Sequence, residues 1–310
     1  MFKLKESIKT SLKLVISLGI IFLLFYKIGF ANIYNTLVTI NPAYLPLILI
    51  YYFIAELVGM LNFWILCVPL GVKLNKIAKP FFISWALSFF IPGKLGELSI
   101  IYFLRKDLEM GKSSAVYLFN KFTSFCIIVI IAIIGVLFFF KEKNLISLTI
   151  VTIIVLVMFF LIALHPKSRY LIRKYILRRY AERFKGFSAT FFDFFKKYKK
   201  IVVLKYILTL IKWLGNTAVV YYLFLAFNQP INYLHVFLIH AIITTIGLIP
   251  LTISGLGLKE GSAVFLYSLI GIGSVITLNV YLIQLIIYYA IAAIILIPYI
   301  LKGETKNLKN

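Results

Sequence analysis

The sequence predicts an all-α polytopic membrane protein with six full transmembrane helices and two re-entrant broken-helix hairpins in an inverted repeat. Three observations lead to this prediction. Hydrophobic residues make up 62% of the 310 residues, against roughly 45–50% in soluble domains. Most of them lie in unbroken runs close to the ~20 residues that a bilayer-spanning helix needs. Two further runs are interrupted near their centres by glycine, proline and charged residues.

The positive charge follows the ends of these runs. The formal net charge is +23, but Lys and Arg concentrate in loops that flank apolar segments, where they set topology and contact anionic lipid. This placement argues against nucleic-acid binding. Cys67 and Cys126 both lie inside apolar runs and the three histidines have no acidic or cysteine neighbours. We therefore expect no disulfide, no metal and no cofactor.

The full crossings follow one another with short connections. They are expected at residues 12–26, 43–70, 113–140, 145–164, 201–227 and 275–301. No small-residue cleavage site follows the first run, so we expect a retained helix there and not a signal peptide. The lysines that precede the first run and end the chain place both termini in the cytoplasm, in the cell membrane.

The two broken runs, 80–104 and 236–271, are expected to turn back within the membrane. In the first, the arms 81–91 and 95–104 would each span only about 15–17 Å as helices, roughly half of a ~30 Å hydrocarbon core. With both runs as hairpins, 25 Lys and Arg fall on the inside and three on the outside. A full crossing by the first would put the strongly basic 166–200 loop outside, against the positive-inside bias.

The same count divides a single membrane domain, 1–310, into repeats 12–140 and 145–301. Each half reads crossing, crossing, hairpin, crossing, so the halves have opposite orientations, as in many transporters. A chance alternation of apolar runs is the alternative. The 166–200 loop interleaves its charge with aromatic residues and is predicted to be an amphipathic cytoplasmic segment on the anionic inner leaflet.

The breaks themselves carry the candidate chemistry. Residues 92–97 read Pro-Gly-Lys-Leu-Gly-Glu, and residues 250–261 read Pro-Leu-Thr-Ile-Ser-Gly-Leu-Gly-Leu-Lys-Glu-Gly. A half-helix that starts after Gly93 or Gly257 would point unpaired N–H groups at the break, and Lys94 or Lys259 would add charge, which suits a lipid phosphate. The simpler alternative is a structural Lys94–Glu97 ion pair in a hairpin shaped by Gly and Pro.

Other intramembrane charges extend the list. Glu56 and Lys121 stand alone in their runs, and either function or pairing across helices explains them. Lys205 and Lys212 lie close enough to the ends of their run that snorkelling to the interface is expected. The candidate substrate-binding residues are Gly93, Lys94, Gly96, Glu97, Arg105, Lys121, Gly255, Gly257, Lys259 and Glu260, with Glu56 as a candidate for energy coupling.

At these motifs the chain resembles the family of the lysylphosphatidylglycerol synthase transmembrane region, a flippase-like membrane domain. The resemblance rests on Pro92-Gly93-Lys94-Leu95-Gly96-Glu97 and on Pro250, Gly255, Gly257, Glu260 and Gly261. Ile100 stands where many members have a basic residue, the nearest arginine being Arg105. A charged element of the third run survives only as Lys121. The bacterial enzymes of this name also carry a C-terminal aminoacyl-transfer domain, and the sequence to Asn310 does not contain it. The resemblance is therefore expected to imply lipid translocation and not lysyl transfer.

Three hypotheses follow. The first is a non-enzymatic flippase that moves an anionic phospholipid or a polyprenyl-phosphate-linked glycan between leaflets, with the phosphate held by two midplane half-helix N-termini. The second is an accessory subunit that docks a cytoplasmic glycosyltransferase through the basic loop. The third, an enzyme acting on lipid phosphate, lacks a recognisable cluster of His, Asp or Glu. The sequence does not decide the lipid, the energy source or whether the protein forms a homo-oligomer.

Overall fold

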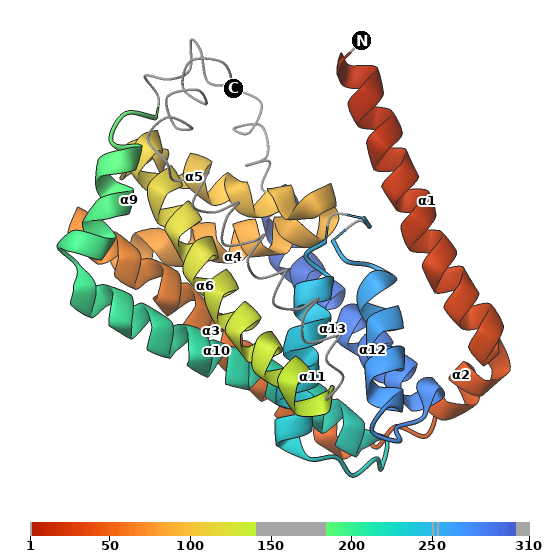
Figure 1. The fold of residues 1–310 in the computed structure, drawn as a ribbon. Coiled ribbons are helices and arrows are strands. Elements are labelled where there is room, and N and C mark those ends of the chain that lie inside the picture. Colours follow the sequence, from red (N-terminus) through yellow and green to blue (C-terminus); the bar gives the residue numbers. More distant parts are fainter. Residues whose placement is uncertain (1, 141–183, 250, 253, 302–310) are drawn as a thin grey trace.

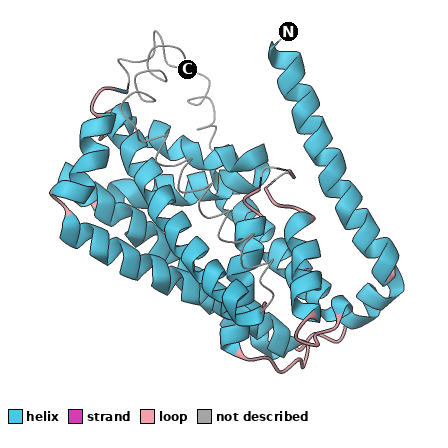
Figure 2. Ribbon diagram, in the orientation of Figure 1, coloured by secondary structure: helices cyan, strands magenta, loops and turns pink. Residues whose placement is uncertain are grey.

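The computed structural model of the protein describes residues 2–140, 184–249, 251–252 and 254–301. Every regular element within these residues is a helix (Figure 2). The α-helices are α1 (Phe2–Ile28), α2 (Phe30–Leu37), α3 (Leu45–Cys67), α4 (Leu74–Phe90), α5 (Ser99–Phe103), α6 (Met110–Phe139), α9 (Phe187–Lys196), α10 (Lys199–Ala226), α11 (Tyr233–Ile246), α12 (Leu258–Ser268) and α13 (Ser274–Leu301). Short 3-10 helices lie between some of them: η1 (Pro42–Tyr44), η2 (Val68–Leu70), η3 (Pro92–Leu98) and η4 (Leu104–Lys106).

Four helical stretches within the described residues are long and apolar enough to cross a membrane. They are Pro42–Leu70, Met110–Phe139, Lys199–Ala226 and Ser274–Tyr299. A multi-pass membrane protein is therefore confirmed, and these four match predicted crossings. The predicted crossing at 145–164 lies outside the described residues, as does most of the basic loop. The count of six and the inverted repeat therefore stay predictions.

The first predicted crossing differs from a simple span. Residues 13–28 of α1 and α2 meet at an angle of 83° around Gly29, so the pair is either a broken span or a re-entrant loop. Gly29 adopts φ 91°, a left-handed conformation that glycine tolerates best. Figure 1 shows α1 standing at the edge of the bundle, where its contacts are with α2 and α12. The sequence did not predict this bend because its signal was a single glycine.

Both predicted broken runs are broken in the structure. Helix α4 ends at Phe90 because Ile91, which precedes Pro92, is extended at φ −98° and ψ 121°, as residues before proline usually are. In the other run, α11 and α12 have 14 and 11 residues, or about 21 and 16 Å at 1.5 Å per residue. Neither is long enough to cross a ~30 Å core.

The second arm of the first break is not the half-helix that the sequence predicted. The chain after Pro92 forms η3, and the five-residue α5 follows. A 3-10 turn closes i→i+3 hydrogen bonds and is tighter than an α-helix, and α5 is only about one turn long. The regular α-helical arm expected after Gly93 is therefore replaced by a 3-10 turn and a short helix.

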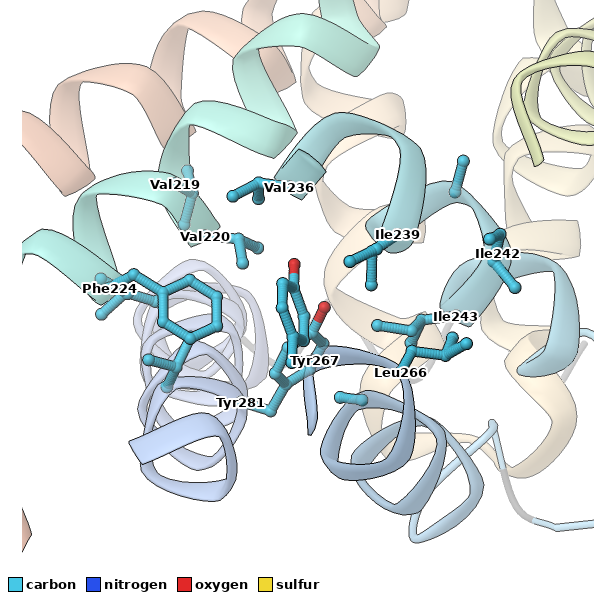
Figure 3. Packing of buried hydrophobic residues seen from close by; sticks show 14 of the residues in the cluster. Val219, Val220, Phe224, Val236, Ile239, Ile242, Ile243, Leu266, Tyr267 and Tyr281 are labelled. Atoms are coloured by element: carbon cyan, nitrogen blue, oxygen red, sulfur yellow. The ribbon is translucent and has the colours of Figure 1, made fainter. Parts of the chain in front are cut away.

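The core lies between the long helices. One cluster of buried side chains joins α3, α6, α10, α11, α12 and α13, and Figure 3 shows part of it around Tyr267 and Tyr281. Helices α3 and α10 approach closely where a Cβ at Gly215 would lie 3.0 Å from that of Ala55. Small residues at membrane helix contacts permit such close packing.

The described end of the basic loop packs against protein. Helix α9 buries Phe191 and Phe194, both 0% exposed, and their rings lie 5.5 and 4.5 Å from that of Phe119 in α6. These two rings face the core and not a lipid surface. The loop's predicted contact with the inner leaflet rests on residues outside this helix, many of which the structure does not describe.

Candidate functional site

A cavity of about 360 Å³ lies between the two broken runs and α3, α6, α10 and α13. Ligand pockets begin at roughly this volume. Both breaks contribute to it, as the sequence predicted for a shared site. The charged residues that line it are Glu56, Lys94, Glu97, Lys121, Lys212, Lys259 and Glu260.

The first break is held tightly to α4. A Cβ at Gly96 would collide with the backbone carbonyl of Leu87, so only glycine permits this approach. The hydroxyl of Ser99 donates to the Gly96 carbonyl at 2.7 Å and lies 2.8 Å from the Ser84 hydroxyl of α4. Lys94, at φ 57°, adopts the left-handed conformation. This conformation places the Lys94 side chain on the cavity lining while Gly96 anchors the turn.

The second break is built differently. Ser254, Gly255 and Gly257 all have positive φ, at 55°, 83° and 80°, and α12 begins directly after them. The Gly257 N–H donates to Glu260 Oε2 at 2.6 Å. Glu260 thus satisfies the N-cap N–H of its own helix. The Lys259 N–H donates to the Gly255 carbonyl at 2.9 Å, so neither of these two N–H groups is available to a phosphate, which corrects the expectation that they point unpaired at the break.

Two ion pairs cross the cavity between helices. Glu97 pairs with Lys121 of α6, and Glu56 of α3 accepts from Lys212 of α10 at 3.0 Å. The alternative interpretation, a Lys94–Glu97 pair within the break, is therefore wrong, because Glu97 pairs with Lys121. Snorkelling of Lys212 is also wrong, because its ammonium group turns inward to Glu56. Glu56 and Lys121 each have an ionic partner, which was one of the two open interpretations.

The lysines of the two breaks have no such partners. Among the described residues, no hydrogen bond or ion pair reaches the ammonium group of Lys94 or of Lys259. Both lysines line the same cavity. The Lys259 stem passes over Gly247, where a Cβ would lie 2.5 Å from Lys259 Cε. The cavity thus holds two paired and two unpaired cations.

The structure gives inward-facing positions to polar residues that were not among the predicted site residues. Lys205, fully buried at 0% exposure, donates to the hydroxyls of Thr209 at 2.9 Å and Ser124 at 3.4 Å. Asn62 donates to the same Thr209 oxygen at 2.9 Å. Snorkelling of Lys205 is therefore wrong. Gly59 leaves room for the Lys212 ammonium group, since a Cβ at Gly59 would lie 2.5 Å from Lys212 Nζ. This glycine was the sequence feature that could have indicated the position of Lys212.

The remaining predicted site residues divide by position. Gly96, Gly255 and Gly257 shape the breaks from behind the lining and are buried. Gly93 lies in η3. Arg105 lies in η4, exposed, with its guanidinium 3.8 Å from the centroid of the Tyr102 ring. The structure therefore does not bring Arg105 to the cavity.

Comparison with known proteins identifies one relationship. A family model described as the lysylphosphatidylglycerol synthase TM region matches residues 11–295. This range includes both breaks and every charged residue of the cavity. No curated protein and no solved structure matches the chain.

Proposed function

Since the chain belongs to the family of the lysylphosphatidylglycerol synthase TM region, we propose that it is a non-enzymatic translocator of anionic lipids. The cargo class is an anionic phospholipid or a polyprenyl-phosphate-linked glycan. One observation supports this most: the two breaks each contribute an unpaired lysine to one cavity inside the membrane domain.

The unpaired lysines favour an anionic ligand. Placing an ammonium group in a membrane domain without an ion-pair partner is unfavourable, and intramembrane charges generally mark ligand or ion pathways. A phosphate between Lys94 and Lys259 would relieve their mutual repulsion and accept hydrogen bonds from both. Such a ligand would contact both broken runs at once, which is how transporters with broken helices hold substrates near the midplane.

The two paired lysines have a different role in this proposal. Glu97 and Glu56 hold Lys121 and Lys212 at the cavity wall and lower its net positive charge. A phosphate that enters competes with these carboxylates, so its binding remains weak enough for release on the other side. The family likeness and the length of α11 and α12 also support re-entrant hairpins that rock against one another.

The decisive experiment is lipid exchange in proteoliposomes. The purified full chain is reconstituted with a labelled phosphatidylglycerol, and the rate at which an external reductant bleaches inner-leaflet label is recorded. We expect the wild-type protein to accelerate exchange, and Lys94→Gln and Lys259→Gln each to slow it at least ~10-fold, because each removes one charge-assisted contact with phosphate.

A matched control uses Lys106→Gln, which removes an exposed lysine from the same segment outside the cavity. Its exchange rate should equal that of the wild type. Mass spectrometry of the recovered lipid should find it chemically unchanged, which separates transport from an enzyme acting on lipid phosphate. Wild-type rates for both cavity variants would contradict the site, and no acceleration of any anionic lipid would contradict the function.

A further inference from the structure

The part of the cavity lining that comes from α4 and α13 is aromatic. Trp85 and Phe89 of α4 and Tyr288 and Tyr289 of α13 all line it; they are called the aromatic wall below. Phe89 lies edge-on to its neighbours, with ring centroids 4.8 Å from Trp85, 6.0 Å from Tyr288 and 5.5 Å from Tyr289. Such edge-to-face contacts hold the rings in fixed orientations.

A second layer supports these rings from α3. The Tyr52 ring is 1% exposed and lies 5.0 Å from Tyr288 and 6.0 Å from Trp85. Gln284 donates to the Tyr288 hydroxyl at 3.0 Å, which fixes that ring further. The aromatic wall is therefore assembled before any ligand enters. Binding a phosphate group does not require the aromatic wall, because phosphate oxygens are stabilised by hydrogen-bond donors and positive charge and not by flat apolar surfaces.

Carboxamides also gather at this cavity. Four of them line it, at Asn62, Asn120, Asn216 and Gln284. The amide oxygens of Asn62 and Asn216 and the indole N–H of Trp213 are buried and have no hydrogen-bond partner within the described residues, so a head group reaches them only if these side chains turn toward the cavity. A carboxamide both donates and accepts, and a hydroxyl group does the same. A phosphodiester only accepts, so it cannot satisfy an amide oxygen.

From the aromatic wall and the carboxamides we propose that the cavity contains a sugar subsite. It lies beside Lys94 and Lys259, which together are called the phosphate clamp. Its ligand is a lipid head group in which a sugar ring is linked to the phosphate. The hydroxyls around the ring pair with the carboxamides, and the apolar C–H face of the ring stacks on the aromatic wall. This inference rests on the proposed function, because the phosphate position is that of Lys94 and Lys259.

Two other occupants fit the lining less well. An acyl chain would cover the aromatic rings but offer no hydrogen-bond partner to the carboxamides that line the cavity. A linear glycerol head group would satisfy some of the carboxamides but has no ring face to cover the aromatic wall. Of the three occupants compared, the ring with hydroxyl groups uses both parts of the lining and the lysines together.

The test compares three water-soluble probes with the purified full chain by calorimetry: glucose 1-phosphate, glycerol 1-phosphate and inorganic phosphate. We expect glucose 1-phosphate to bind roughly tenfold more tightly than glycerol 1-phosphate, because of the ring stacking and the added hydrogen bonds. Trp85→Leu should reduce this ratio to about threefold or less, whereas Trp85→Phe should keep most of it. Asn120→Leu, at a half-buried position, serves as a second variant, and melting curves check that each variant folds.

The possible outcomes separate this inference from the proposed function. Lys94→Gln should weaken all three probes alike and leave the ratio between the two organic phosphates unchanged. Equal wild-type binding of glucose 1-phosphate and glycerol 1-phosphate, with both lost in Lys94→Gln, overturns the sugar subsite alone. Binding of no probe, or binding insensitive to Lys94→Gln, overturns the phosphate clamp and the subsite with it.

Discussion

The two breaks share a composition but not a construction. In the first, a 3-10 turn is pressed against α4 at Gly96, and its acid, Glu97, reaches across to Lys121 of α6. In the second, left-handed residues lead into α12, and its acid, Glu260, stays within its own first turn as a cap. The lysine points into the same cavity in both.

The acid of the same residue pattern therefore has a different structural role in each break: a link between helices in the first and a helix cap in the second. The acid of the first break links it to a neighbouring helix, so a movement of α6 would pull on η3. The acid of the second break stabilises only local structure, so α12 can move as a unit with its cap intact. The lysines are the common element, and four changes test which features of the contrast matter.

The largest effect is expected at Gly96. In Gly96→Ala the new methyl group collides with the Leu87 carbonyl, and the unfolding free energy should fall by about 3 kcal/mol. Gly273→Ala is the control, since nothing lies within 4 Å of a Cβ there. Thermal unfolding in detergent measures both. Equal melting temperatures would mean that the turn can move away from α4 at little cost.

The second largest effect is expected for the coupling between the acid of each break and a lysine of the cavity. A double-mutant cycle with Glu97→Ala and Lys121→Ala should give a coupling free energy of about 1–2 kcal/mol, because the two side chains form an ion pair across helices. The matching cycle with Glu260→Ala and Lys259→Ala should give less than about 0.5 kcal/mol. Chemical unfolding in mixed micelles measures each corner. Similar coupling in both cycles would remove the contrast between the breaks.

A smaller effect is expected from the cap of α12 taken alone. Glu260→Ala leaves the Gly257 N–H without its 2.6 Å acceptor and should cost about 1 kcal/mol of stability. Glu260→Gln keeps an acceptor oxygen and should cost only a few tenths of that, about 0.3 kcal/mol. Melting temperatures of the two variants give the answer. A large loss in Glu260→Gln would indicate that the charge, and not the cap, is needed.

The smallest effect is expected at Arg105. The structure places this side chain on Tyr102 and away from the cavity, so Arg105→Gln should change the lipid exchange rate less than about twofold, within the ~0.5 kcal/mol typical of surface changes. The proteoliposome assay with Lys94→Gln in parallel provides the scale. A loss as large as that of Lys94→Gln would show that Arg105 belongs to the transport path.

The positions of four crossings and of both breaks were accessible from the sequence, because these signals are local. Apolar run length predicts a spanning helix, and Pro92 with its preceding residue ends α4 through a steric effect between neighbours. The charges of Lys94, Lys121 and Lys259 could likewise be assigned to the membrane domain. Each of these conclusions depends on residues that are adjacent in the chain.

Only the tertiary structure decided which charges meet. Glu97 pairs with Lys121, 24 positions away, and Lys212 with Glu56, 156 positions away. The aromatic wall and the carboxamides likewise come from helices that are remote in sequence. An ion pair or a cavity lining depends on how helices rotate and pack against one another, and small residues such as Gly59 and Gly96 set that approach. Hydropathy and local motifs do not determine which side chains of remote helices come into contact.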